Sequence, residues 1–383
     1  MNIEHIIKAA VERGASDLHI KAGDVFRARI DGDLRPLTKQ RLTPEQTKAI
    51  ALKMIPTQAI RETIDTLRDY DCTWGAPGIG RFRVNILRQR SSFMIVLRFI
   101  PFDIPSFDKL GHPPALVDRL ITIDHGIVLV SGGPGTGRSS TVAAFVHHIN
   151  TTVNRHLVTL ESPIEFLHRD LQSSVTQREV GVDTEDFTSG LQASLRQDPD
   201  VVVVQELFDH TMIDTAMAAA ETGRLVVSTL HTADVTSTLA RLVAMFPPRE
   251  QDVARLRIAD TLKAVICQRL LAREDEKGRC LVCEILLVTP EIREAIRDRA
   301  RAGDIYALMA DGRESQGTQT FEQHLLDLRQ SGVISQEAAR AAARDDVEFD
   351  RLCGAAEGHD MADGQERRRG KRERRRGIRD RRR

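Results

Sequence analysis

Residues 127–141 read IVLVSGGPGTGRSST, an apolar strand-like run followed by a glycine-rich turn. The turn fits the phosphate-binding pattern G-x-x-x-x-G-K-[ST], except that Arg138 stands at the place of the lysine. Such a loop aims backbone N–H groups at phosphate oxygens, and the helix that follows favours their negative charge. We therefore expect ATP and Mg²⁺ as cofactors. The predicted contacts are Gly132, Gly133, Pro134, Gly135, Thr136, Gly137, Arg138, Ser139 and Ser140, with Ser139 as the Mg²⁺ ligand.

The residues around this loop repeat one pattern, a short apolar run followed by a polar turn and a helical stretch. The runs are GIVLVSG, HLVTLES, DVVVVQE and RLVVSTLH. Strands that are apolar on both faces are typical of a parallel sheet covered by helices. The sequence therefore predicts an α/β fold with a P-loop core over residues 115–290. Helical patterns continue through 291–350 and predict a C-terminal helical region.

The residues before the core predict a smaller α+β domain over 1–103. The stretch VFRARIDGDLRPL alternates apolar and polar residues around Asp31-Gly32, which predicts a β-hairpin. Thr43, followed by Pro44 and then Gln46, predicts the start of a helix with a capping box. The proline-rich stretch that follows the last strand predicts a linker over 104–114.

Polar side chains follow three of the apolar runs. Glu161 and Glu165 follow the second run, Glu206 the third and His231 the fourth. Ligands of open α/β sheets bind at the carboxyl ends of the strands. A carboxylate there can orient or deprotonate an attacking water, and a histidine can sense the γ-phosphate. We interpret all four as catalytic candidates; the alternatives are solvated acids and a histidine that caps a turn.

Three arginines lie on the strands of the first domain. Arg81 and Arg83 share one face of the stretch GRFRVN, and Arg98 follows in VLRFIP. Alternating arginines usually form a solvated face. If the domain docks on the nucleotide of a neighbouring subunit, they are instead candidates for fingers that stabilise charge on the transferring phosphoryl group.

Composition limits the location of the chain and its partners. No run of eighteen or more apolar residues exists, so we expect no integral membrane segment. The first residues suit an amphipathic helix rather than a signal peptide, which predicts a cytoplasmic protein. Residues 367–383 hold eleven arginines and one lysine against Glu373 and Asp380, a net charge of +10, so the remaining residues sum to −10. We predict a disordered basic tail over 351–383 that contacts anionic lipid or nucleic acid.

The five cysteines predict reduced thiols rather than a disulfide framework. Cys280 and Cys283 are spaced C-x-x-C in a strand-like stretch, where residues three apart point to opposite faces. Because no second such pair exists to complete four ligands, we favour structural thiols over a zinc site.

Several strings occur in the order found in the secretion ATPase superfamily. They are ASDLHI, RIDGDLRPL, GRFRVN, ESPIEF, LRQDPDVVVV, TGRLVVSTLHT and FPP, and PEIREAIRD resembles a C-terminal motif of the type IV pilus retraction branch. The chain from residue 1 to about 345 is similar to that branch. The resemblance implies a PAS-like N-terminal domain, a RecA-like core and a hexameric ring, homomeric or mixed with a related ATPase, that holds nucleotide between protomers. It further implies withdrawal of pilin subunits through a platform protein, at the periphery of the inner membrane.

The departures from the family pattern cluster around the nucleotide. Besides Arg138, the chain has Ser162 in the acidic box, Gln205 before Glu206, Phe208 for an arginine and Arg224 for a histidine. A guanidinium is planar and wider than an ammonium, so it should crowd the loop or turn out of it. Losing one preorganised donor to the transition state typically lowers a rate by about 10²–10³-fold. We therefore expect nucleotide binding with feeble or absent hydrolysis.

Three functions stay open at this stage. The first is a working retraction ATPase with an adapted site, and the second is a non-hydrolysing paralogue that supports an active ring. The third is a RecA-like protein that binds nucleic acid through its tail. Aromatic residues make up 4% of the chain, with one Trp and two Tyr, which leaves little for base stacking and disfavours the third.

Overall fold

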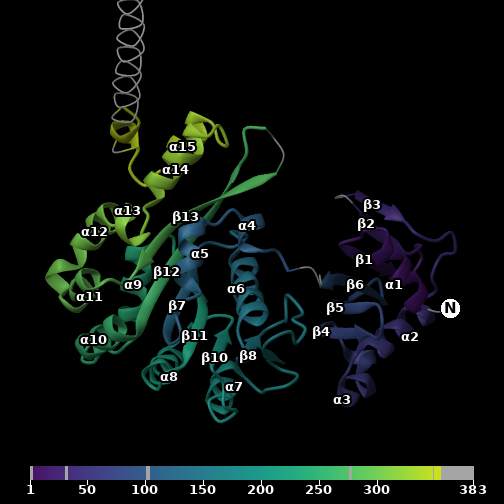
Figure 1. Cartoon of the computed structure of the whole chain (residues 1–383). Coiled ribbons are helices and arrows are strands. Elements are labelled where there is room, and N and C mark those ends of the chain that lie inside the picture. Colours follow the sequence, from purple (N-terminus) through teal and green to yellow (C-terminus); the bar gives the residue numbers. More distant parts are fainter. Residues whose placement is uncertain (1–2, 31–32, 101–103, 276–277, 348, 355–383) are drawn as a thin grey trace, which may run out of the picture. The chain divides into compact units, whose positions relative to one another are not determined.

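The computed structural model describes residues 3–30, 33–100, 104–275, 278–347 and 349–354 (Figure 1). The described residues form two compact units. Unit 1 holds the residues up to Ile104 together with 150–194, and unit 2 holds 105–149 and the residues from Leu195 onward. Segment 150–194 thus groups with the N-terminal residues, although it lies within the predicted core in sequence. The domain boundaries at 103, 114, 290 and 350 stay predictions, and the basic tail lies outside the described residues from 355 onward.

Unit 1 contains a six-stranded antiparallel sheet in the order β3-β2-β1-β6-β5-β4. Its strands are β1 (Asp17–Lys21), β2 (Arg27–Ile30), β3 (Asp33–Pro36), β4 (Asp69–Ala76), β5 (Gly80–Gln89) and β6 (Ser92–Ile100). Its helices before residue 104 are α1 (Ile3–Glu12), α2 (Pro44–Met54) and α3 (Gln58–Glu62). Pairing of Ile30 with Asp33 confirms the predicted hairpin, although its turn lies outside the described residues. Thr43 and Gln46 form the predicted capping box at the start of α2.

The core of unit 1 lies on one face of this sheet. Ile7 of α1 and Met54 of α2 are fully buried, as are Leu18, Ile86 and Leu97 of the strands. These strand residues alternate with more exposed neighbours, as expected when one face of a sheet is buried. Unit 1 also includes β8 (His156–Glu161), which pairs in parallel with β9 (Ser174–Glu179), and α7 (Phe187–Ser194).

Unit 2 contains strands in the order β13-β12-β7-β11-β10. They are β7 (Gly126–Ser131), β10 (Val201–Val204), β11 (Leu225–Leu230), β12 (Leu262–Ala272) and β13 (Arg279–Leu287). Strands β10, β11, β7 and β12 are parallel, and β13 is antiparallel to β12. Every residue of β7, β10 and β11 is buried, which confirms the prediction from their continuous apolar runs.

Helices cover the strands of unit 2 and extend it toward the C-terminus (Figure 1). Helix α8 packs on β7 and β11, α9 packs on β12 and β13, and α14 packs on β13. The helices up to β12 are α4 (Phe107–Leu110), α5 (Pro114–Leu120), α6 (Arg138–Thr152), α8 (His210–Glu221), α9 (Val235–Ala244) and α10 (Gln251–Thr261). After β13 come α11 (Pro290–Arg297), α12 (Ile305–Asp311), α13 (Arg313–Gln316), α14 (Phe321–Gln330) and α15 (Gln336–Ala342).

Candidate nucleotide site

The glycine-rich loop connects β7 to α6 in unit 2, as the sequence predicts. Its backbone has left-handed φ angles of +149° at Gly132, +76° at Gly135 and +89° at Gly137, which side chains rarely tolerate. A Cβ at Gly132 would also come within 2.5 Å of the Thr136 hydroxyl and 2.6 Å of the Gln268 carbonyl oxygen. The loop shape therefore depends on glycine, and its exposed part leaves the main chain open to a ligand.

Hydrogen bonds tie the start of this loop to the end of β11. The Ser131 hydroxyl lies 3.0 Å from the Leu230 carbonyl and 3.0 Å from the Thr232 N–H, which donates to it. The Gly132 N–H donates to the same Leu230 carbonyl at 3.3 Å. These bonds place His231, between Leu230 and Thr232, next to the loop.

The Arg138 side chain is directed at the end of β11. One guanidinium nitrogen donates to the Leu230 carbonyl at 2.8 Å, and the other lies 3.1 Å from His231 Nε2. The Leu230 oxygen thus receives Arg138 in addition to the Ser131 hydroxyl and the Gly132 N–H. The guanidinium is therefore held by contacts within the protein. The compact ammonium of a lysine would make different contacts from the same position.

His231 Nε2 also lies 3.1 Å from the Glu206 carboxylate, so one nitrogen faces two partners with opposite needs. A protonated Nε2 donates to Glu206 and cannot accept from Arg138, whereas an unprotonated Nε2 accepts from Arg138 and offers nothing to the carboxylate. Arg138 therefore competes with Glu206 for His231. The structure brings together these three of the predicted site residues.

The hydroxyl groups at the start of α6 are available for a ligand. Within the described part of the chain, the Ser139 and Ser140 side chains make no hydrogen bond, whereas the Thr136 hydroxyl donates to the Gly133 carbonyl at 2.9 Å. Among the described residues, no group of three His, Cys, Asp or Glu side chains is arranged to hold a metal ion. Any ion here would depend on Ser139 together with oxygens of the nucleotide.

Glu161 and Glu165 belong to unit 1 and are described within it. Glu161 ends β8, and its carboxylate accepts hydrogen bonds from the Thr159 hydroxyl at 2.7 Å, the Gln177 amide at 3.1 Å and the Glu165 N–H at 3.3 Å. Burial raises the pKa of Glu161 despite these bonds. The Glu165 side chain is exposed and has no hydrogen bond among the described residues.

The three predicted finger arginines have different surroundings in unit 1. Arg81 forms an ion pair of 2.9 Å with the buried carboxylate of Glu179. Arg98 forms one of 2.9 Å with the buried carboxylate of Asp17. Arg83 is exposed and, in the part of the chain that the structure describes, makes no hydrogen bond or ion pair. Of the three, Arg83 is the side chain that can reach a partner without breaking an internal ion pair.

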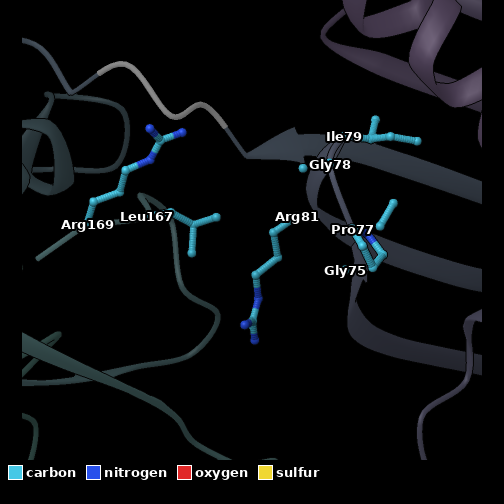
Figure 2. Close-up of a pocket in the computed structure, with 9 residues that line it drawn as sticks. Gly75, Pro77, Gly78, Ile79, Arg81, Leu167 and Arg169 are labelled. Carbon is cyan, nitrogen blue, oxygen red and sulfur yellow. The ribbon is translucent and has the colours of Figure 1, made fainter.

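Arg81 also borders a pocket of unit 1 (Figure 2). The pocket has a volume of about 530 Å³ and is lined by residues 75–80, from the end of β4 through the turn to the start of β5, together with Arg81, Leu167 and Arg169. The Glu179 carboxylate that holds Arg81 was not predicted. The rule applied to Glu161, that an acid ends a strand, would have found it, because Glu179 ends β9.

The chain is similar to known proteins over most of its length. Residues 1–340 match the family described as "Type II/IV secretion system protein". The chain belongs to the type II/IV secretion system protein family. It is 37% identical over 345 residues to the type IV pilus ATPase PilU of Pseudomonas aeruginosa, covering 90% of this chain and 89% of that protein. It is 36% identical over 344 residues to the retraction ATPase PilT of the same organism, covering 90% and 98%.

Solved structures agree with this family membership. The crystal structure of the pilus retraction motor PilT with bound ADP superposes with a TM-score of 0.83 and 39% identity, covering 92% of this chain and 99% of that one. The RecA-like core expected of the secretion family therefore fits this mixed α/β structure. In the described residues of this family member, every helix is too short or too polar to cross a bilayer.

Proposed function

We propose that the chain is a type IV pilus retraction protein that binds ATP at residues 132–140 and drives or supports the withdrawal of pilin subunits. Membership of the secretion family and identity to PilU and PilT over most of both chains support this proposal. The P-loop supports the nucleotide part of it, since glycines hold a backbone that presents its N–H groups.

The residues present fit a Mg²⁺–nucleotide complex. Three glycines with left-handed φ open the loop main chain to phosphate oxygens, and the Ser139 hydroxyl, without a hydrogen bond among the described residues, would contact the metal. Mg²⁺ bound there would neutralise charge on the phosphate oxygens. Glu206 follows β10 in the same unit and would orient a water for attack.

One observation supports the proposal that this site hydrolyses ATP weakly: Arg138 contacts Leu230 and His231. A P-loop lysine reaches the β- and γ-phosphates, whereas this guanidinium is occupied by a carbonyl oxygen and by the imidazole that Glu206 also contacts. We therefore propose that nucleotide binding persists and that intrinsic hydrolysis is weak. In this form the chain acts as a supporting subunit of a retraction ring.

Assembly into a hexamer, homomeric or mixed with a related ATPase, would place nucleotide between protomers. Arg83 would then be the finger that contacts the neighbour's phosphates, because Arg81 and Arg98 are held by Glu179 and Asp17. The ring would lie at the periphery of the inner membrane on a platform protein, and the basic tail would add contact with anionic lipid.

Calorimetry and phosphate release on the purified full chain test the proposal. We expect ADP and ATP–Mg²⁺ to bind, turnover to stay well below the range of about 1–100 s⁻¹ that phosphoryl-transfer enzymes reach, and sedimentation to report a hexamer when nucleotide is present. Addition of a hydrolysing relative should yield mixed rings on a native mass spectrum. Absence of nucleotide uptake, or a particle that stays a single protomer under all these conditions, would contradict the proposal.

A further inference from the structure

A second cavity lies in unit 2, apart from the P-loop. It has a volume of about 400 Å³, within the range of small-molecule sites. It opens between the start of α5, strand β13 and the segment from α13 to α14. Its lining residues are Gly111, His112, Pro113, Pro114, Leu116, Ile285, Arg313, Glu314, Gly317, Thr318, Gln319, His324 and Asp327. The function proposed above uses none of them.

His324 supplies a buried hydrogen-bond donor to this cavity. The residue is 7% exposed, and burial lowers its pKa, so the ring is neutral. Its Nδ1 accepts the Cys283 backbone N–H at 3.0 Å, which leaves the ring proton on Nε2. Among the described residues, Nε2 has no hydrogen-bond partner, and it is not one of the fully buried atoms. Because His324 lines the cavity, this N–H faces it.

Gln319 supplies an acceptor from the same backbone position. The residue is 6% exposed, and its amide nitrogen donates to the Cys283 carbonyl at 3.0 Å, which fixes the orientation of the amide. The amide oxygen has no hydrogen-bond partner among the described residues and, like His324 Nε2, is not one of the fully buried atoms. Because both side chains are anchored on Cys283, a fixed donor and a fixed acceptor lie on one wall.

The charge of the lining disfavours an anion. Arg313 is paired with Asp327, so its charge is neutralised, and Glu314 adds an exposed negative charge. His112 adds none, because burial lowers its pKa to about 4 and its Nε2 is bound to the Thr141 hydroxyl at 2.9 Å. With both histidines neutral, the lining carries a net charge of −1.

The remaining wall is apolar and rigid. It consists of two consecutive prolines, Pro113 and Pro114, together with the buried side chains of Leu116 and Ile285. Proline rings and branched side chains present C–H groups to the cavity, and these favour contact with the apolar face of a planar ligand ring. The polar pair formed by His324 and Gln319 then accounts for the orientation of such a ligand.

We propose that this cavity binds an uncharged planar heterocycle that carries a carboxamide or a lactam. The carbonyl of the ligand accepts from His324 Nε2, its N–H donates to the Gln319 oxygen, and its ring lies against the prolines. A buried donor and acceptor reject analogues that cannot satisfy both, because an unpaired buried polar group is costly. Discrimination between an amide and a carboxylate of the same shape is therefore the signature of the site.

Nicotinamide and nicotinate are a matched pair of probes for this test. Titrations followed by NMR use the full chain with saturating ADP and Mg²⁺, so that the P-loop site is occupied. We expect nicotinamide to bind with a Kd of about 1 mM or below, and nicotinate to bind at least about tenfold more weakly. Equal binding of the two probes, or no binding of nicotinamide, overturns the proposal.

Two variants locate the binding. His324→Asn keeps an oxygen near the place of Nδ1 for the Cys283 N–H but removes the donor at Nε2, so nicotinamide affinity should fall about tenfold. Glu314→Gln alters only an exposed rim charge; it should leave nicotinamide unchanged and tighten nicotinate. Thermal melting checks that each variant folds. If His324→Asn does not fold, Glu314→Gln still decides, since an unchanged ratio between the probes contradicts binding in this cavity.

Discussion

Replacing Arg138 by lysine should activate the nucleotide site. The substitution removes the guanidinium contacts to the Leu230 carbonyl at 2.8 Å and to His231 Nε2 at 3.1 Å. It returns a compact ammonium to the loop and leaves His231 to Glu206 alone. A preorganised donor to transition-state charge contributes about 2.7–4 kcal/mol, so we expect phosphate release to accelerate by about 10²–10³-fold.

The same substitution should cost a little stability, which separates the two roles of Arg138. Hydrogen bonds from a charged donor stabilise by about 1.5–3 kcal/mol when buried, but this side chain is half-exposed, and solvent screening lowers that to about 1 kcal/mol. For a domain of this size the melting temperature should fall by about 2–4 °C. A more active and slightly less stable protein is therefore the expected combination.

The assay is phosphate release by the full chain at nucleotide saturation, with saturation set by calorimetry on each variant. Arg279→Lys is the matched control, because Arg279 also contacts the loop, at 3.4 Å from the Gly135 carbonyl, but lies at an exposed position away from His231. It should leave the rate unchanged. An Arg138→Lys variant that binds nucleotide as before and hydrolyses it no faster would refute an inhibitory role of Arg138. Turnover of the natural protein at about 1–100 s⁻¹ would refute it too.

Five further substitutions test other parts of the structure. Gly132→Ala should abolish nucleotide binding, measured by calorimetry, because its Cβ has no room. Gly133→Ala has open space around its Cβ and should change the melting temperature by less than about 2 °C. Both variants are checked by calorimetry and by thermal melting. Burial raises the pKa of Glu284 to about 7. Its contribution to the free energy of unfolding is therefore fully present below the pKa of the unfolded state and is lost as the pH rises toward 7. Glu284→Gln should remove this loss, which is about 3 kcal/mol at pH 8, and urea titrations at several pH values would measure it. Glu179→Gln should destabilise by about 1–3 kcal/mol, because the half-buried Arg81 guanidinium loses its ionic partner. Arg83→Ala should stay within about 0.5 kcal/mol and lower only the activity of assembled rings.

Local signals explain which parts of the fold could be predicted from the sequence. The capping box of Thr43 and Gln46 and the hairpin around Asp31-Gly32 involve residues a few positions apart, so their geometry is set by nearby backbone and is visible in the sequence. The continuous apolar runs of β7, β10 and β11 are also visible in the sequence, and they predict burial on both faces of these strands. The loop between β7 and α6 follows from glycine spacing alone.

Partners that are distant in the sequence explain what could not be predicted. Arg138 and His231 lie 93 residues apart, and Arg81 and Glu179 lie 98 apart. A sequence shows that an arginine is charged but not which carboxylate or carbonyl it meets, because that depends on how the strands are ordered. The three arginines of the first domain therefore looked alike in the sequence, whereas the structure separates Arg83 from the two that are internally paired.

In the proposed function, main-chain and side-chain contributions to this site are separable, which would allow the loop to bind nucleotide while hydrolysing it weakly. Phosphate binding depends on the glycine φ angles and on backbone N–H groups. Both are kept when arginine stands at position 138 in place of a lysine. In the proposed function, cleavage would depend on a cation and on the pair formed by Glu206 and His231, and the Arg138 guanidinium contacts His231 of that pair. Selection for nucleotide-dependent assembly alone would therefore preserve the glycines and the strand ends while tolerating Arg138. A ring that contains such subunits would keep its shape and its nucleotide, and the force for retraction would come from whichever neighbours retain the lysine.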